Sequence, residues 1–259
     1  MIYIVGAGSG AVDLITVRGA RLMQKADVVV YAGSLVNPQI LTEYTKPECR
    51  IYDSARMTLE EVLQVLRAGE KAGQTVVRLH TGDPCLYGAI REQMDALDAQ
   101  GIAYEVVPGV SSFCGAAAAL CAEYTLPGVS QSVIITRMAG RTPVPEREEI
   151  EKLASHGATM VIFLSTGYLK ALREHLLSGG YASDTPAAIV YKATWPDEKV
   201  VRGTVEELPR MAKENGIEKT ALILVGGFLG NQYDRSKLYD PSFSHGYRTA
   251  GCPESIHED

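Results

Sequence analysis

The segment IYIVGAGSGA, residues 2–11, places a short apolar run directly before three closely spaced glycines. A run of four apolar residues that ends at glycine is typical of a buried β-strand followed by a tight turn. Glycines let the backbone turn sharply and approach a ligand, and the N-terminus of a following helix favours an anion. The segment therefore predicts a strand–turn–helix unit with a possible binding loop.

The same unit recurs through the first part of the chain. Residues 58–61, Thr-Leu-Glu-Glu, form a capping box that starts a further helix. Strands alternating with helices predict a mostly parallel sheet that is covered on both faces. The expected strands are 2–5, 28–31, 76–79 and 104–107, and the other expected helices are 13–26, one from about residue 89, and 111–122.

Residues 123–131 contain a Pro-Gly turn signal and interrupt both periodicities, so they are predicted to link two domains. A short Trp-Pro-Asp-Glu link at 195–198 predicts a hairpin, and hence a mixed second sheet. We expect two α/β domains, 1–122 and 132–230, and a C-terminal extension, 231–259. The expected second-domain strands are 132–136, 160–164, 187–191, 199–202 and 221–225, and the helices are 146–155, 168–178 and 205–215.

Composition excludes several classes of protein. The 259 residues are 46% hydrophobic and 22% charged, with a net charge of −6, which argues against a broad nucleic-acid-binding surface. No apolar run approaches the roughly 18 residues of a membrane span, and no signal peptide precedes the first strand, so a cytoplasmic protein is expected. The five cysteines have no C-x-x-C spacing, and we predict neither a disulfide framework nor a metal site.

The first glycine loop has two interpretations by itself: a dinucleotide-binding site or a structural turn. Gly6, Gly8 and Ala11 fit the loose G-x-G-x-x-A pattern of a dinucleotide site. That site requires an acidic residue at the end of the second strand, whereas the chain reads Val30-Tyr31-Ala32 there. An NAD-dependent oxidoreductase is therefore disfavoured, and a purely structural glycine turn stays open.

Two further glycine-bearing turns follow strands of the same predicted sheet. One is Thr81-Gly82-Asp83-Pro84, and the other is Pro108-Gly109-Val110-Ser111-Ser112. Taken singly, the first can be an Asx turn and the second a helix N-cap. The carboxyl ends of parallel strands share one sheet edge, so three such turns together predict a ligand crevice.

These segments carry a family resemblance. The first loop with its Asp-Leu-Ile-Thr continuation at 13–16, the Gly-Asp-Pro turn at 82–84, the turn at 108–112 and Tyr-Lys-Ala-Thr-Trp-Pro at 191–196 resemble the tetrapyrrole (corrin and porphyrin) methyltransferases. Residues 136–145 and 236–240 are similar to the branch that methylates C11 of precorrin-4 or its cobalt form. The resemblance spans about residues 1–248.

The resemblance implies a homodimer of two-domain chains that binds S-adenosylmethionine in a trough between the domains and acts on a tetrapyrrole. The acidic charge and the short apolar runs predict no nucleic-acid or membrane partner. The family's usual first loop, Gly-Pro-Gly-Asp-Pro-Asp-Leu, reads Gly-Ser-Gly-Ala-Val-Asp-Leu here, so no role is transferred to Ala11. The cofactor positions that the resemblance implies are Gly8, Thr81, Gly82, Asp83, Leu86, Ser111, Ser112, Leu164 and Ala193.

A precorrin carries several carboxylate side chains, and guanidinium groups suit such partners. Some of the basic residues in or beside the motif loops are therefore expected to form a basic wall; they are Arg78, Arg137, Arg141 and Lys192. His80 and Tyr87 are candidates for handling the ring proton, although packing roles are open for both and no general base is assigned. Other ring positions, an RNA or protein-histidine substrate, and a non-catalytic tetrapyrrole carrier are the remaining alternatives.

Overall fold

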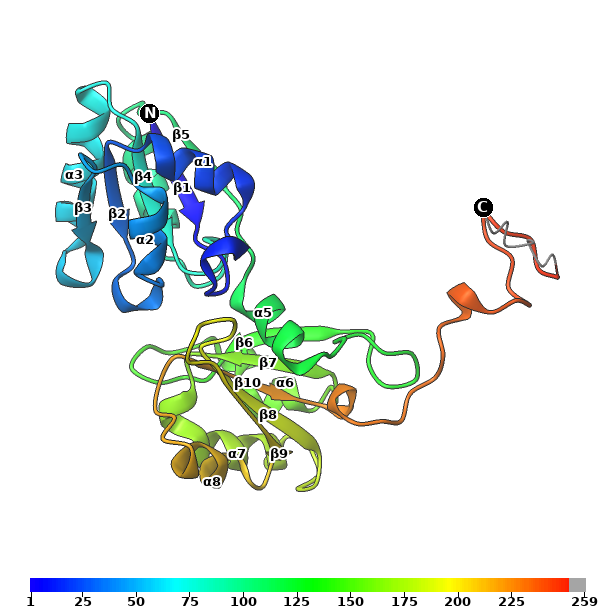
Figure 1. The fold of residues 1–259 in the computed structure, drawn as a ribbon. Coiled ribbons are helices and arrows are strands. Elements are labelled where there is room, and N and C mark those ends of the chain that lie inside the picture. Colours follow the sequence, from blue (N-terminus) through cyan, green and yellow to red (C-terminus); the bar gives the residue numbers. More distant parts are fainter. Residues whose placement is uncertain (252–259) are drawn as a thin grey trace.

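The computed structural model describes residues 1–251 and contains two five-stranded sheets (Figure 1). The first sheet has the strand order β3-β2-β4-β1-β5, and every neighbouring pair in it is parallel. This is the parallel sheet predicted for the N-terminal part. Its strands are β1 Ile2–Gly6, β2 Val28–Tyr31, β3 Arg50–Asp53, β4 Val76–His80 and β5 Tyr104–Val107.

Helices cover both faces of the first sheet, as the alternating pattern predicts. On one face Val5 and Leu79 pack with Met23 of helix α1, and on the other Val30 packs with Leu66 of α3 and Leu97 of α4. The helices are α1 Val17–Lys25, α2 Gln39–Tyr44, α3 Leu59–Lys71 and α4 Arg91–Asp98. The predicted capping box is present at the start of α3.

The second sheet has the order β6-β7-β10-β8-β9. Strands β6 and β7 are parallel, whereas the other three pairs are antiparallel, so the predicted mixed sheet is confirmed. Three helices cover one face, where Met160 and Ile189 pack with Leu172. The elements are β6 Val133–Arg137, α6 Ile150–Ala154, β7 Thr159–Phe163, α7 Leu169–Ser178, β8 Pro186–Tyr191, β9 Lys199–Thr204, α8 Leu208–Glu214 and β10 Ala221–Val225.

The other face of the second sheet is covered by helix α5, Ser112–Leu120, which follows the last strand of the first sheet (Figure 1). Ala116 and Leu120 pack against Val161 and Leu222, and the Arg202 side chain donates to the Leu120 carbonyl at 2.5 Å. Helix α5 falls within the region 1–122 that the sequence assigns to the N-terminal domain. Its packing belongs to the second sheet, because its small apolar side chains fit the strand surface there.

Two elements of the first unit, α2 and β3, were not predicted, and helix α1 begins only at Val17 with Thr16 as its cap. Beyond the second sheet, residues 231–251 extend away from both sheets and hold a single short 3₁₀ turn at Lys237–Tyr239 (Figure 1). The rest of the predicted extension, with Cys252, lies outside the described residues. Within residues 1–251, none of the helices has the length and apolar character needed to cross a membrane.

Candidate functional site: a trough between the two sheets

The three glycine-bearing turns meet at one edge of the first sheet. The backbones of Gly8 and Gly82 exchange two hydrogen bonds, of 2.9 and 3.2 Å. A Cβ on Gly6 would lie 2.6 Å from the Cα of Gly109, which is closer than non-bonded carbon atoms approach each other in proteins. The glycines therefore let the ends of β1, β4 and β5 touch backbone to backbone, as expected for a shared crevice.

Asp83 holds two of these turns together. Its Oδ1 accepts the Cys85 N–H and its Oδ2 accepts the Gly109 N–H, both at 2.8 Å. Burial acts to raise the pKa of Asp83, but hydrogen bonds from Cys85 and Gly109 outweigh it and hold the pKa below the ordinary 3.8. The carboxylate is thus ionised at neutral pH and positions the loop as well as facing the trough.

A cavity of about 370 Å³ lies between the two sheet units at this edge. From the first unit it is lined by the turn after β4 and the start of α5, and from the second by the ends of β7, β8 and the turn before β10. Eight of the nine expected cofactor positions line it: Thr81, Gly82, Asp83, Leu86, Ser111, Ser112, Leu164 and Ala193. The ninth, Gly8, does not line the cavity, but its backbone is hydrogen-bonded to that of Gly82, which does.

Several residues of the cavity wall have strained backbones. Tyr87, Leu164, Lys192 and Thr220 all line the cavity, and their φ angles are between +46° and +56°. This left-handed conformation is costly for residues with a Cβ and is concentrated at functional sites. Four such residues around one cavity favour a functional site there.

Of the expected basic wall, Lys192 lies at the cavity. Its Nζ bonds Asp197 at 2.6 Å and lies 5.0 Å from the centre of the Trp195 ring. The hydrogen bond to Asp197 raises the pKa of Lys192, so the ammonium stays charged. Tyr87 also lines the cavity and packs on Phe163 with ring centres 5.3 Å apart; burial raises the pKa of its hydroxyl.

Arg137 folds its own loop. Its guanidinium donates to the carbonyl oxygens of Met138, Thr142 and Pro143 at 3.3, 3.2 and 2.7 Å. These bonds curl the loop that carries Arg141, whose side chain is exposed. Neither arginine lines the cavity; Arg137 supports the loop, and Arg141 is exposed on it.

Arg78 and His80, both expected at the substrate site, do not line the cavity. Arg78 is 6% exposed and donates to the Gln93 side chain and the Val30 carbonyl, each at 3.1 Å. His80 is 3% exposed, and burial together with the charge of Arg78 lowers its pKa to about 3. Both side chains lie on the same face of β4, because alternate residues of a strand face the same side of the sheet, and the bond from Arg78 to Gln93 shows that this face is the one covered by α4.

The sequence profile of the tetrapyrrole (corrin/porphyrin) methylases matches residues 1–209. The chain belongs to the tetrapyrrole methylase family. The cobalt-precorrin-4 C(11)-methyltransferase of Methanocaldococcus jannaschii is 52% identical over 248 residues, covering 95% of each protein.

Solved structures agree with this membership of the tetrapyrrole methylases. An X-ray structure of a cobalt precorrin-4 methyltransferase superposes with a TM-score of 0.86 at 48% identity, covering 89% of this chain and 96% of the other. A uroporphyrin-III C-methyltransferase from Thermus thermophilus, complexed with S-adenosylhomocysteine, gives a TM-score of 0.71 at 26% identity, covering 88% and 92%.

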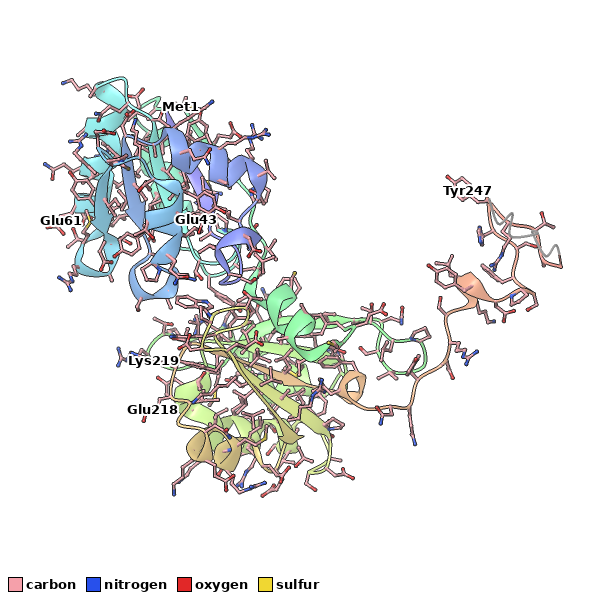
Figure 2. All side chains as sticks on the ribbon, viewed as in Figure 1. Met1, Glu43, Glu61, Glu218, Lys219 and Tyr247 are labelled. Atoms are coloured by element: carbon pink, nitrogen blue, oxygen red, sulfur yellow. The ribbon has the colours of Figure 1, made fainter. Side chains whose placement is uncertain are left out.

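Sequence reasoning missed part of this methylase trough. Trp195 lies in a motif that carried the resemblance, so its place in the wall was accessible from the sequence, whereas Glu218 and Lys219 precede β10 without any motif signal. Figure 2 labels the latter two on the second unit. The cavity residues that were not predicted are Ser9, Ser34, Leu35, Phe163, Thr166, Gly167, Val190, Trp195, Glu218, Lys219, Thr220, Ala221 and Leu222.

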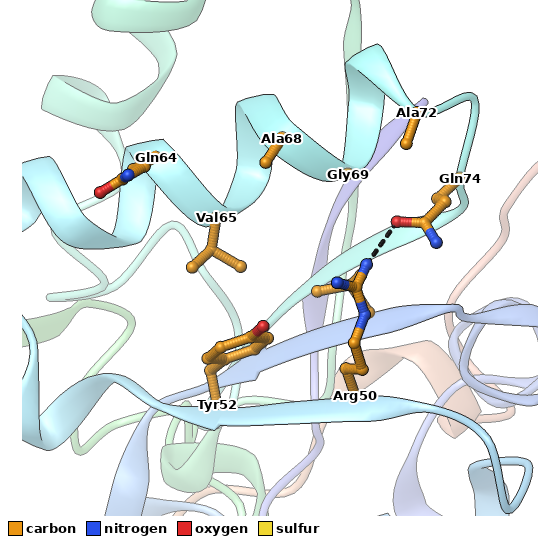
Figure 3. Close-up of a pocket in the computed structure, with 9 residues that line it drawn as sticks. Arg50, Tyr52, Gln64, Val65, Ala68, Gly69, Ala72 and Gln74 are labelled. Atoms are coloured by element: carbon orange, nitrogen blue, oxygen red, sulfur yellow. Dashed lines mark hydrogen bonds between the residues drawn. The ribbon is translucent and has the colours of Figure 1, made fainter.

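A second cavity, of about 410 Å³, lies between β3 and α3 (Figure 3). Arg50 and Gln74 line it and bond each other at 2.6 Å, with Tyr52 beside them. It contains none of the glycine turns and no residue of the methylase motifs. The trough is therefore the candidate active site of this methylase. Residues 1–251 hold no group of three His, Cys, Asp or Glu side chains placed to bind a metal ion.

Proposed function

We propose that this protein transfers a methyl group from S-adenosylmethionine to C11 of precorrin-4 or cobalt-precorrin-4, in corrin assembly. The observation that carries the proposal is the convergence of the three glycine turns, Leu164 and Ala193 on one cavity. The relatives named for this reaction support the choice of ring position.

The trough fits S-adenosylmethionine in its chemistry. Leu86, Leu164, Val190 and Ala193 provide apolar walls suited to an adenine ring, and Asp83 provides a carboxylate suited to hydroxyl or ammonium groups. Ser111 and Ser112 stand at the N-terminus of α5, where hydroxyl and N–H groups suit a carboxylate. When bound, S-adenosylmethionine supplies an activated methyl group on its sulfonium.

The protein's own task in this chemistry is placement. An electron-rich ring carbon needs no covalent help from the enzyme when it is held in line with the donor, and such positioning can lower a barrier by roughly 7–11 kcal/mol at best. The backbone-to-backbone contacts at Gly8, Gly82 and Gly109 give the trough the rigidity that this requires.

We assign the substrate's carboxylates to Lys192 and Lys219, which line the trough, and to Arg141 on the loop that Arg137 folds. Lys192 is prepositioned by Asp197, while Lys219 and Arg141 are exposed and available. Tyr87 and Phe163 offer an aromatic surface for the macrocycle. Arg78 and His80 have no part in this substrate site.

Mass spectrometry of the product tests the proposal. The enzyme is incubated with labelled S-adenosylmethionine and, separately, precorrin-4 and cobalt-precorrin-4; the expected product gains one labelled methyl group, placed at C11 by NMR. A label at another ring position would select a different tetrapyrrole methylation, and no methyl gain with either substrate would refute the proposal. Titration with S-adenosylhomocysteine against NADH separates a methyltransferase from an oxidoreductase.

A homodimer, which the resemblance implies, and a cytoplasmic location, which is expected from the apolar pattern of the sequence, are part of the proposal. So is the three-part division into residues 1–122, 132–230 and 231–259, with the qualification that α5 packs on the second sheet. Light scattering on the purified chain measures the dimer directly. A monomeric mass at working concentrations would remove the dimer from the proposal and leave the methyl transfer standing.

A further inference from the structure

Thr194 joins the two sheet units through its hydroxyl. It lies in the turn after β8, yet its Oγ1 is 3.0 Å from the Oγ of Ser9 and accepts the Ala11 N–H at 3.0 Å. These partners belong to the first glycine loop, more than 180 residues earlier in the chain. One side chain of the second unit therefore holds the loop that follows β1.

The Thr194 turn is itself fixed. The φ angle of Thr194 is +67°, a left-handed conformation that only a strong local constraint maintains in a β-branched residue. Its N–H donates to the Glu198 carboxylate at 2.6 Å, which closes the turn. The hydroxyl is thus presented to the first loop by a strained and braced backbone.

The contact is tight on both sides of the first loop. A Cβ added to Gly10 would overlap the Trp195 ring, so only glycine permits this approach. On the far side, the Asn37 amide donates to the Gly10 carbonyl at 2.9 Å. Loop 8–11 is therefore clamped between the Thr194 turn and the first unit, in the segment where this chain departs from the family's usual sequence.

The clamp connects the two walls of the trough. Ser9 lines the first-unit wall of the cavity, where the adjacent Gly8 is bonded to Gly82. Ala193 and Trp195 line the second-unit wall, and Thr194 between them does not line the cavity. We propose that Thr194 is a positioning residue, which acts through Ser9 and Ala11 to set the separation of the two walls that hold the methyl donor. The inference rests on the proposed function, since it concerns the same trough.

Thr194→Val keeps the shape of the side chain and removes its hydroxyl, which leaves the Ala11 N–H unpaired. We expect about tenfold weaker binding of S-adenosylhomocysteine by calorimetry, the loss that one unsatisfied polar group causes. The KM for S-adenosylmethionine should rise and kcat should fall, whereas Thr194→Ser should restore both. The matched control is Thr204→Val, which loses a hydroxyl on β9 outside the trough.

A double-mutant cycle and hydrogen exchange complete the test. Ser9→Ala and Thr194→Val should be non-additive, because they remove the same contact, and the Ala11 amide should exchange faster in Thr194→Val even without added ligand. The inference would be overturned if Thr194→Val had the same affinity and kinetics as Thr194→Ser, or if its losses were no larger than those of Thr204→Val. Unchanged hydrogen exchange at the Ala11 amide of Thr194→Val would also overturn it. Failure of the wild-type protein to bind S-adenosylhomocysteine would instead overturn the proposed function, and the inference with it.

Discussion

Replacement of Asp83 by asparagine keeps the shape of the side chain but should destabilise the turn that forms the first-unit wall of the trough. Each carboxylate oxygen accepts one backbone N–H at 2.8 Å, from Cys85 and from Gly109. Asparagine has one acceptor oxygen, so one of these two N–H groups must lose its partner. The Gly109 N–H is partly buried, and leaving such a group without a partner costs about 1–3 kcal/mol, whereas water can replace the carboxylate at the exposed Cys85 N–H. For a chain of this size, each kcal/mol lowers Tm by about 2–4 °C, so a fall of up to about 12 °C is expected.

The same loss should weaken ligand binding, because the turn that Asp83 fixes forms the first-unit wall of the trough. If ordering this turn on binding costs about 1–3 kcal/mol, the Kd for S-adenosylhomocysteine rises about 5- to 150-fold. Calorimetric titration and thermal unfolding measure the two effects. Asp184→Asn is a matched control, since Asp184 is an exposed carboxylate in the loop between α7 and β8 and does not line the trough.

The effect of pH on this variant has a defined sign. Because the folded-state pKa of Asp83 is lowered from 3.8, its contribution to stability is complete above that value and is lost as the pH falls through the folded-state pKa. The Tm difference between wild type and Asp83→Asn should therefore be constant from pH 7 to 5 and shrink below about pH 4. Wild-type Tm and Kd in the variant, with the control behaving alike, would refute the assigned role.

Three further predictions concern residues that the sequence placed in the substrate site. Arg78→Met should lower Tm by several degrees while leaving the substrate KM of the folded enzyme unchanged, which steady-state kinetics after thermal profiling would reveal. Arg137→Lys, which cannot reproduce three carbonyl bonds, should raise the substrate KM several-fold with an unaltered Kd for S-adenosylhomocysteine; equal effects on both would contradict a loop role. His80, with its pKa lowered to about 3, favours the unfolded state as the pH falls below 6.5, so urea unfolding should show a loss of up to about 2 kcal/mol between pH 7 and 5 that His80→Gln abolishes.

The sequence predicts the layers of this fold well because buried parallel strands are continuous apolar runs. Strand β3, Arg50–Asp53, escaped prediction because it lies at the sheet edge, where its side chains are partly or fully exposed and its apolar signal is weak. Helix α2, Gln39–Tyr44, is too short to show a helical period. Helix α5 was predicted as a helix, but its all-round small apolar surface gives no indication of which sheet it covers.

The parts of the candidate site that have a local sequence signal could be predicted, whereas those set by tertiary pairing could not. Turns with glycine, aspartate and proline carry their geometry in local sequence, and the turns after β4 and β5 line the trough as expected. The direction of a strand side chain depends on register. The sequence therefore placed Arg78 and His80 next to the site but could not show whether their side chains enter it. Lys219 and Glu218 reach the trough only because β10 is inserted between β7 and β8, a tertiary pairing without a local signal.

The place of β10 has a consequence for the synthesis of the chain. The first sheet has all its strands once Val107 has left the ribosome, whereas the second lacks its central strand until residues 221–225 emerge. Helix α5 is made early, but the sheet face that it covers stays incomplete until that strand arrives. The nascent protein should therefore have a folded N-terminal unit and an uncovered apolar helix while about a hundred further residues are made. During this interval we expect chaperones to bind the exposed helix.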